Sequence, residues 1–230
     1  MVAEHVQNNI KPLSEDPAQD PEPREECGVF GVWAPGEEVS KLTYFGLFAL
    51  QHRGQEAAGI AVGDDDRIVV FKDMGLVSNV FDESILSSLH GNVAVGHTRY
   101  STAGGKEWSN VQPMFGTSPS GVDIALGHNG NLVNYLELRA EAVDRGLIKP
   151  QEESVSDSMC LSMLLADGVS DDTTVFDSAL ELLPSVKGAF CLTFTDGHTL
   201  YAARDPHGVR PLSLGRLSTG SVSYTHLTRP

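Results

Sequence analysis

The sequence predicts a mixed α+β domain whose strands pair largely antiparallel. Two pairs of apolar segments, 57–62 with 67–72 and 188–196 with 200–203, each flank a short polar or glycine-containing turn and are predicted to form β-hairpins. Two further segments, 132–145 and 157–166, have the length and apolar spacing of helices. Hairpins and helices in one chain of this size are typical of an α+β fold.

The first apolar run, at residues 27–34, is predicted to be a buried strand, because its two glycines permit close backbone approach. A helix is expected after it, with Ser40 as the candidate N-cap. The spacing of apolar residues in this helix would place Leu42, Phe45 and Ala49 on its buried face.

Later elements are predicted from helix caps and from polar interruptions. Gly146 is expected to end the first of the two long helices, and Ser156 is expected to cap the second. Short strands are expected at 93–96 and 123–127, and a polar cluster follows each of them.

Composition and charge limit the kind of protein that the sequence can encode. A net charge of −15 argues against a nucleic-acid surface, which needs clustered lysine and arginine. Three cysteines without metal-ligand spacing fit free thiols in a reducing compartment. Neither an 18-residue apolar run nor the apolar region of a secretory signal is present, so we expect no membrane span and a cytoplasmic location. No histidine pair has ligand spacing on one helix face, so no zinc or iron site is predicted.

Residues 1–26 precede the first predicted strand and differ from the rest in composition. They are rich in Asp and Glu and are interrupted by four prolines, which predicts a disordered leader. If the bond between Glu26 and Cys27 is cut, Cys27 becomes a new N-terminus. Its α-amino group, with a reference pKa of about 8, can then act as the general base for its own thiol. The alternative is that Cys27 is a small buried apolar residue.

The polar clusters that follow the two short strands lie where layered folds commonly keep their sites. One runs from His97 to Gly104, and the other is the His-Asn-Gly-Asn run at 128–131. The Asn129-Gly130 pair predicts either a tight turn or an oxyanion hole, in which the Asn amide and the next backbone N–H face a developing negative charge. The two interpretations are compatible, because a turn can aim the N–H. The acidic run at 63–66 is interpreted as a turn rather than a metal site.

Five motifs follow one another along the chain. They are Cys-Gly-Val-Phe-Gly at 27–31, Leu-Gln-His-Arg-Gly-Gln-Glu at 50–56, Gly-His-Thr-Arg-Tyr-Ser-Thr at 96–102, Gly-His-Asn-Gly-Asn at 127–131 and Arg-Asp-Pro-His-Gly-Val-Arg-Pro-Leu at 204–212. Together they resemble the glutaminase domain of the amidophosphoribosyltransferase family. Each motif alone is weak, whereas five in this order are specific, and the second and the last favour this family over other class II amidotransferases.

The resemblance implies a four-layer αββα sandwich of the N-terminal nucleophile (Ntn) hydrolase type. It also implies that the leader is a propeptide whose removal frees Cys27. In the family reaction, the amide nitrogen of glutamine is released as ammonia and placed on 5-phosphoribosyl diphosphate. This transfer is the first committed step of purine synthesis.

Matching positions give each site residue an expected role. Cys27 would attack the glutamine amide, and Asn129 with the Gly130 N–H would stabilise the oxyanion. For glutamine binding, the resemblance implies that Arg99 clamps the substrate α-carboxylate, with Thr102 beside it as a hydrogen-bond partner. It also implies that Asp157 holds the α-ammonium group and that Arg53 and Gly54 belong to a loop that lines the cysteine site. The alternative for Asp157 is that it complements a helix dipole.

The resemblance also predicts the domain organisation. The glutaminase domain would span 27–217, with a disordered propeptide at 1–26 and an aberrant tail at 218–230 that departs from the family pattern. No phosphoribosyltransferase domain corresponds to any part of the chain. Mg²⁺ and an iron–sulfur cluster would therefore belong to that absent domain, and we expect no metal or cofactor here. The partners would be glutamine and, through the absent domain, 5-phosphoribosyl diphosphate, in a homo-oligomeric full-length enzyme.

Two other interpretations of the sequence stay open. The chain could be the glutaminase domain of a different class II amidotransferase, such as a glucosamine-6-phosphate or asparagine synthetase type, but those usually begin with cysteine directly after the initiator methionine. It could also be an inactive, unprocessed fragment that only binds or regulates. Every expected site position is filled, which counts against an inert module.

Overall fold

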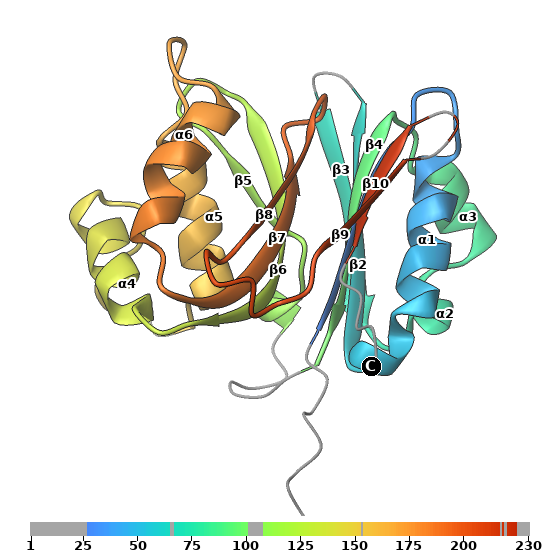
Figure 1. Ribbon diagram of the computed structural model, residues 1–230, viewed down its shortest axis with the longest axis horizontal. Coiled ribbons are helices and arrows are strands. Elements are labelled where there is room, and N and C mark those ends of the chain that lie inside the picture. Colours follow the sequence, from blue (N-terminus) through green and yellow to red (C-terminus); the bar gives the residue numbers. More distant parts are fainter. Residues whose placement is uncertain are drawn as a thin grey trace, which may run out of the picture.

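A computed structural model describes residues 27–64, 67–100, 108–152, 154–216, 218 and 220–224. Two antiparallel sheets face each other at the centre, and helices cover the outer face of each, which gives four layers (Figure 1). This arrangement confirms the predicted αββα sandwich. Among the described helices, none has the length and apolar character needed to cross a membrane.

The larger sheet contains six strands within the described residues, in the order β3-β2-β4-β1-β10-β9. Strand β1 lies at its centre between β4 and β10, with Gly28 opposite Thr98 and Phe30 opposite Tyr224. The strand bounds are Gly28–Trp33 for β1, Ala57–Asp64 for β2, Arg67–Met74 for β3, Val93–Arg99 for β4, Ser213–Arg216 for β9 and Ser221–Tyr224 for β10.

The smaller sheet has the order β5-β6-β7-β8, counted over the same described segments. Its strands are β5 at Met114–Thr117, β6 at Asp123–Leu132, β7 at Gly188–Thr195 and β8 at Leu200–Arg204. Strand β5 pairs with β6 only from Asp123 to Leu126, whereas β7 pairs with it as far as Leu132. Within the part of the chain that the structure describes, the second half of β6 therefore has a strand neighbour on one side only.

Each sheet has its own helical layer. Helices α4 (Tyr135–Asp144), α5 (Asp157–Asp167) and α6 (Val175–Leu182) cover the smaller sheet, and α1 (Val39–Ala49), α2 (Val77–Val80) and α3 (Glu83–Ser88) cover the larger one (Figure 1). Ser156 caps α5 as predicted, because its side chain accepts a hydrogen bond from the Met159 N–H. Short 3₁₀ helices lie at Gln51–Arg53, Trp108–Asn110 and Leu183–Ser185.

The prediction for α1 was wrong in its start and in its buried face. The helix begins one residue before Ser40, whose hydroxyl donates to the Leu86 carbonyl at 2.9 Å instead of capping. Thr43 and Leu47 are buried, whereas Phe45 is 65% exposed. The sequence pattern alone cannot separate an aromatic residue that faces solvent from one that faces the sheet.

Two large hydrophobic clusters hold the layers together, one on the outer face of each sheet. The first packs the smaller sheet against α4, α5 and α6, with Leu161, Leu164 and Phe190 among its buried members. The second packs the larger sheet against α1, α2 and α3. A third, small cluster of Ala61, Ile68 and Ala125 joins the inner faces of the two sheets. The small side chains at this junction let the sheets approach closely.

The sheet extends beyond the domain boundary that we expected at residue 217. Ser221–Tyr224 forms β10, which lies between β1 and β9, so this part of the expected aberrant tail is built into the larger sheet. Residues 225–230 and the leader 1–26 lie outside the described residues.

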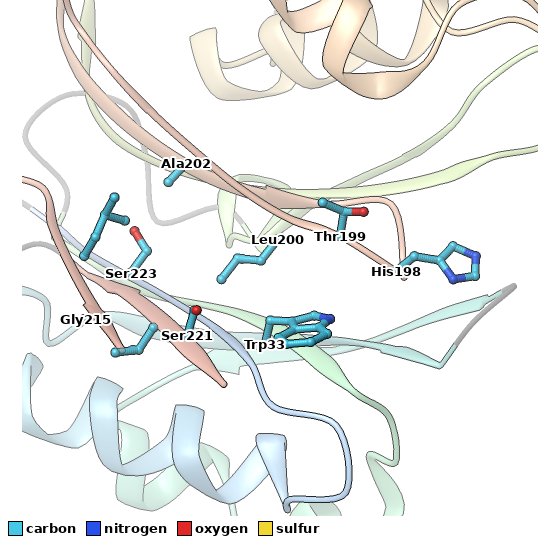
Figure 2. Close-up of a pocket in the computed structure, with 10 residues that line it drawn as sticks. Trp33, His198, Thr199, Leu200, Ala202, Gly215, Ser221 and Ser223 are labelled. Atoms are coloured by element: carbon cyan, nitrogen blue, oxygen red, sulfur yellow. The ribbon is translucent and has the colours of Figure 1, made fainter. Parts of the chain in front are cut away.

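A cavity of about 500 Å³ opens between β8 and the strands β9 and β10. Trp33 and Leu200 lie on opposite sides of it, and Ser221 and Ser223 come from β10 (Figure 2). Trp33 ends β1, at the opposite end from Cys27. The cavity is therefore separate from the polar residues that gather around Cys27.

Candidate active site

Cys27 lies directly before β1, where that strand begins beside the end of β4. Its side chain is partly exposed, and its thiol donates to the Tyr100 carbonyl at 3.6 Å. The Cys27 backbone has φ of +42°, a left-handed conformation that is uncommon for any residue except glycine. The predicted nucleophile thus lies at a strand end, in a locally strained backbone.

Arg53 lies next to Cys27, and Gly54, the following residue, packs on the end of β4. Arg53 is 2% exposed, and its Nε donates to the Cys27 carbonyl at 2.9 Å. Gly54 packs so closely on the end of β4 that a Cβ there would lie 2.7 Å from the Thr98 carbonyl oxygen. A larger residue at this position would push the loop that carries Arg53 away from Cys27.

Three charged groups influence the pKa of the Cys27 thiol. Burial raises its pKa above the ordinary value, the positive charges of Arg99 and Arg53 oppose that rise, and the Asp157 carboxylate adds to it. Arg99 is itself buried at the end of β4. Since burial is the largest effect, the thiol stays protonated near neutral pH and needs a base to become a nucleophile.

Asn129 and Gly130 lie within β6 and not in a turn, so the tight-turn interpretation was wrong. Asn129 is opposite Cys191 and Gly130 is opposite Phe190 on β7. Asn129 is fully buried, and both polar atoms of its amide lack a hydrogen-bond partner among the described residues. An unsatisfied buried amide is costly, which favours a functional role for this side chain.

Asp157 is the first residue of α5 and also contacts β6. Its Oδ2 accepts a hydrogen bond from the Leu132 N–H at 3.3 Å, and its Oδ1 lies 3.9 Å from His128 Nδ1. The acid therefore joins the helix layer to the strand that carries Asn129. This position is compatible both with a helix-dipole role and with binding a substrate ammonium group.

Four buried polar residues connect these parts and were given no role from the sequence: His97, Gln112, His128 and Ser158. His97 Nε2 lies 3.1 Å from the His128 carbonyl, to which it donates, and His128 Nδ1 lies 2.9 Å from Ser158 Oγ. Burial lowers the pKa of His97 to about 3 and also lowers that of His128, so both rings are neutral at pH 7. Both histidines belong to recognised motifs, but nothing in the sequence pattern distinguishes Gln112 or Ser158.

Two expectations cannot be placed at this site. Thr102 lies outside the described residues. In the described ranges there is also no group of three or more His, Cys, Asp or Glu side chains positioned to hold a metal ion. The expectation that metals and cofactors belong to another domain stays a prediction.

Comparisons with known proteins relate this geometry to a family. A family model described as a glutamine amidotransferase domain matches residues 97–225. The amidophosphoribosyltransferase of Mycobacterium tuberculosis (strain H37Rv) is 61% identical over 211 residues, which cover 90% of this chain and 40% of that protein. The enzyme of the same name from Mycobacterium leprae is 63% identical over 202 residues, covering 87% of this chain and 36% of that protein.

A solved structure resembles the fold as well. The glutamine phosphoribosylpyrophosphate amidotransferase of Bacillus subtilis, solved with ADP and GMP, has a TM-score of 0.75 and 38% sequence identity. The match covers 86% of this chain and 41% of that chain. The chain thus spans about 40% of the length of the curated relatives it matches.

Proposed function

Because the chain belongs to the glutamine amidotransferase domain family, we propose that it is the glutaminase domain of an amidophosphoribosyltransferase. In this role it releases ammonia from glutamine, and the remainder of the enzyme transfers that ammonia to 5-phosphoribosyl diphosphate at the start of purine synthesis. The observation that carries the proposal is the position of Cys27, whose carbonyl is bound by Arg53 and whose thiol is under the influence of Arg99 and Asp157.

The reaction begins with attack of the Cys27 sulfur on the side-chain amide carbon of glutamine. The thiol proton passes to the α-amino group of Cys27, and the carbonyl oxygen becomes an oxyanion. Asn129 Nδ2 and the Gly130 N–H donate to this oxyanion. The C–N bond then breaks, the amino group returns the proton to the leaving nitrogen, and ammonia departs. Water hydrolyses the resulting thioester to glutamate and restores the thiol.

Substrate recognition uses the two charged groups on the α-carbon of glutamine. Arg99 binds the α-carboxylate of glutamine, since its planar guanidinium can donate two parallel hydrogen bonds. Asp157 binds the α-ammonium, and Thr102 supports the carboxylate contact. Arg53 and Gly54 form the wall beside Cys27. The distance between the two charged groups of glutamine and its amide then decides which carbon meets the sulfur.

The mechanism needs a free α-amino group at Cys27 and hence removal of residues 1–26. This requirement matters because burial raises the pKa of the thiol, which therefore needs a base. Among the described residues, the hydrogen-bond partners of Cys27 are the Arg53 guanidinium and the Tyr100 carbonyl, and neither of them can act as that base. We further propose that the complete enzyme acts in the cytoplasm as a homo-oligomer, with Mg²⁺ and any iron–sulfur cluster bound outside this domain.

The intact mass and the glutaminase activity of the purified chain test the proposal together. We expect a mass that lacks residues 1–26, and ammonia release from glutamine that depends on this loss. A chain that lacks the leader, folds and releases no ammonia from glutamine would contradict the proposed function.

Replacement of the nucleophile provides the second test. Cys27→Ala should reduce ammonia release to background, because no other group can form the thioester, and the leader should stay attached. Cys160→Ala is the matched control, since Cys160 is a buried thiol in the core beneath the smaller sheet. Ammonia release should persist in that variant. Persistent release in Cys27→Ala would rule out the mechanism.

A further inference from the structure

We propose that Gln112 is a positioning residue for glutamine hydrolysis: its side-chain amide holds the His128 backbone and thereby sets the Asn129–Gly130 segment that receives the oxyanion. The inference rests on the proposed function and assigns a task to a residue outside the five recognised motifs. Gln112 precedes β5 and is 7% exposed.

The Gln112 amide binds both polar groups of one backbone residue. Its Oε1 accepts from the His128 N–H at 2.7 Å, and its Nε2 donates to the His128 carbonyl at 3.3 Å. The His128 carbonyl belongs to the same planar peptide group as the Asn129 N–H. Holding that carbonyl therefore fixes the orientation at which Asn129 leaves the backbone.

This double hydrogen bond replaces a missing strand. Strand β5 stops pairing with β6 at Leu126, so among the described strands the following residues of β6 have a neighbour only on the β7 side. Backbone groups of successive residues in an antiparallel ladder point alternately to the two sides. The N–H of Gly130 therefore faces the same side of β6 as the N–H of His128. Gln112 binds the backbone of His128 on this side and leaves the N–H of Gly130 available to the oxyanion.

Gln112 is itself held firmly in the space between the sheets. Lys72 Nζ donates to the carbonyls on both sides of it, at 2.5 Å to Val111 and 3.1 Å to Pro113. Its own carbonyl packs so tightly on β2 that a Cβ at Gly59 would lie 2.1 Å from it. A positioning residue has to be more rigid than the group that it positions, and these contacts supply that rigidity.

The same amide also reaches the opposite end of the site. Gln112 Nε2 lies 3.2 Å from Ser158 Oγ, and Ser158 follows Asp157 on α5. His97 donates to the same His128 carbonyl at 3.1 Å. One buried network thus joins the strand that stabilises the oxyanion to the acid that binds the substrate ammonium group.

The chain offers a matched control for Gln112. Asn134 is also a buried amide, 7% exposed, and it also binds backbone on both sides, with Nδ2 donating to the Ser185 carbonyl at 3.0 Å and Oδ1 accepting from the Lys187 N–H at 2.9 Å. It lies at the start of α4 and contacts neither Asn129 nor Asp157 through any hydrogen bond of the described residues.

The experiment compares Gln112→Met with Asn134→Leu in the full chain. Each variant removes the amide and keeps a similar volume. We expect similar losses of thermal stability, but Gln112→Met should lower kcat for glutamine about 10- to 100-fold with KM nearly unchanged, because the misplaced donors act on the transition state. Asn134→Leu should leave both constants near those of the parent. If Gln112→Met does not fold, Gln112→Asn takes its place in the experiment. The asparagine side chain keeps an amide but is too short to reach both His128 groups, so this variant should show the same selective loss of kcat.

Amide hydrogen exchange provides a readout that does not depend on activity. Residues 128–131 should exchange faster in the Gln112 variants than in the parent or in Asn134→Leu. Equal exchange in the two variants, or a kcat that stays at the parent value, overturns the proposal. If the parent releases no ammonia from glutamine, the proposed function fails, and the exchange at 128–131 alone decides whether Gln112 holds β6.

Discussion

At the scale of single residues, the site combines a thiol that resists ionisation with charges that favour it. Burial raises the Cys27 pKa, and Arg99 and Arg53 act in the opposite direction. The thiol therefore stays protonated near neutral pH until a base removes its proton. The structure brings Arg53 and Arg99 close to Cys27 and packs Gly54 on the end of β4, while the role of each stays a prediction.

Asp157 allows the substrate-binding role to be separated from a helix-dipole role. Asp157→Asn should raise KM for glutamine about 10- to 100-fold, since a charge-assisted contact to the α-ammonium is lost, and should change kcat little. Asp177→Asn is the control, because Asp177 is also an acid in the first turn of a helix and forms the capping box of α6 with Thr174. Steady-state kinetics on both variants give the answer. If the KM of Asp157→Asn equals that of Asp177→Asn, Asp157 only complements the dipole of its helix.

At the scale of elements, local signals predicted the existence of strands and helices better than their ends. The strand expected at 123–127 continues to Leu132, and the one expected at 93–96 continues to Arg99. An Asn-Gly pair signals a turn when nothing else competes. Here pairing of β6 with β7 overrides that signal, so residues 128–131 become strand residues, while His97, Thr98 and Arg99 of the other polar cluster belong to β4. The sequence pattern carries no information on such a distant partner.

Gly130 shows why β6 can pass through this position. Its φ is +156°, and a Cβ would lie 2.2 Å from the Ala189 carbonyl oxygen. Gly130→Ala should therefore destabilise the protein by more than about 2 kcal/mol, from strain and overpacking together. Gly121→Ala is the control, since Gly121 also has a positive φ, +87°, but no atom lies within 4 Å of its would-be Cβ.

Urea unfolding of the two glycine variants measures the difference. The Gly121 variant should lose only about 1 kcal/mol, which corresponds to backbone strain alone. Similar losses at both positions would show that the space beside Ala189 can accept a methyl group and that β6 is less constrained than its geometry indicates.

At the scale of the whole molecule, the two sheets enclose neutral histidines whose protonation opposes folding. The pKa of His97 is lowered from 6.5 to about 3, and burial lowers that of His128 as well. Between about pH 6.5 and pH 3 the unfolded chain therefore binds a proton at His97 that the folded chain does not. The stability that His97 contributes is complete above pH 6.5 and falls by about 1.4 kcal/mol per pH unit as the pH decreases, and the lowered pKa of His128 acts in the same direction.

The free energy of unfolding, measured in urea at pH 7 and pH 5, tests this pH dependence. The parent should lose about 2 kcal/mol more than His97→Gln over this interval, since the glutamine amide cannot titrate and can still donate to the His128 carbonyl. An identical loss in both proteins would mean that His97 is protonated in the folded state or contributes nothing to acid unfolding.

The four-layer architecture was predictable because five short motifs, spaced along the chain from residue 27 to residue 212, indicated the family. The strand β10 was not predicted, because residues 218–230 were expected to depart from the family pattern, whereas the family model matches as far as residue 225 and β10 pairs with β1. Main-chain hydrogen bonds require little of the side chains, so inspection of side-chain motifs alone could not indicate this pairing.

The close contact between Gly59 and the Gln112 carbonyl has a consequence for the ways in which this protein can change. A strand residue that must remain without a side chain fixes where the backbone at residue 112 can lie, and with it the point from which the Gln112 amide reaches β6. The dependence runs one way: a larger residue at 59 would displace that backbone and move the amide, whereas a different residue at 112 keeps the carbonyl and so keeps the need for glycine at 59. Redesign of the interior can therefore vary residue 112 but has to retain the glycine.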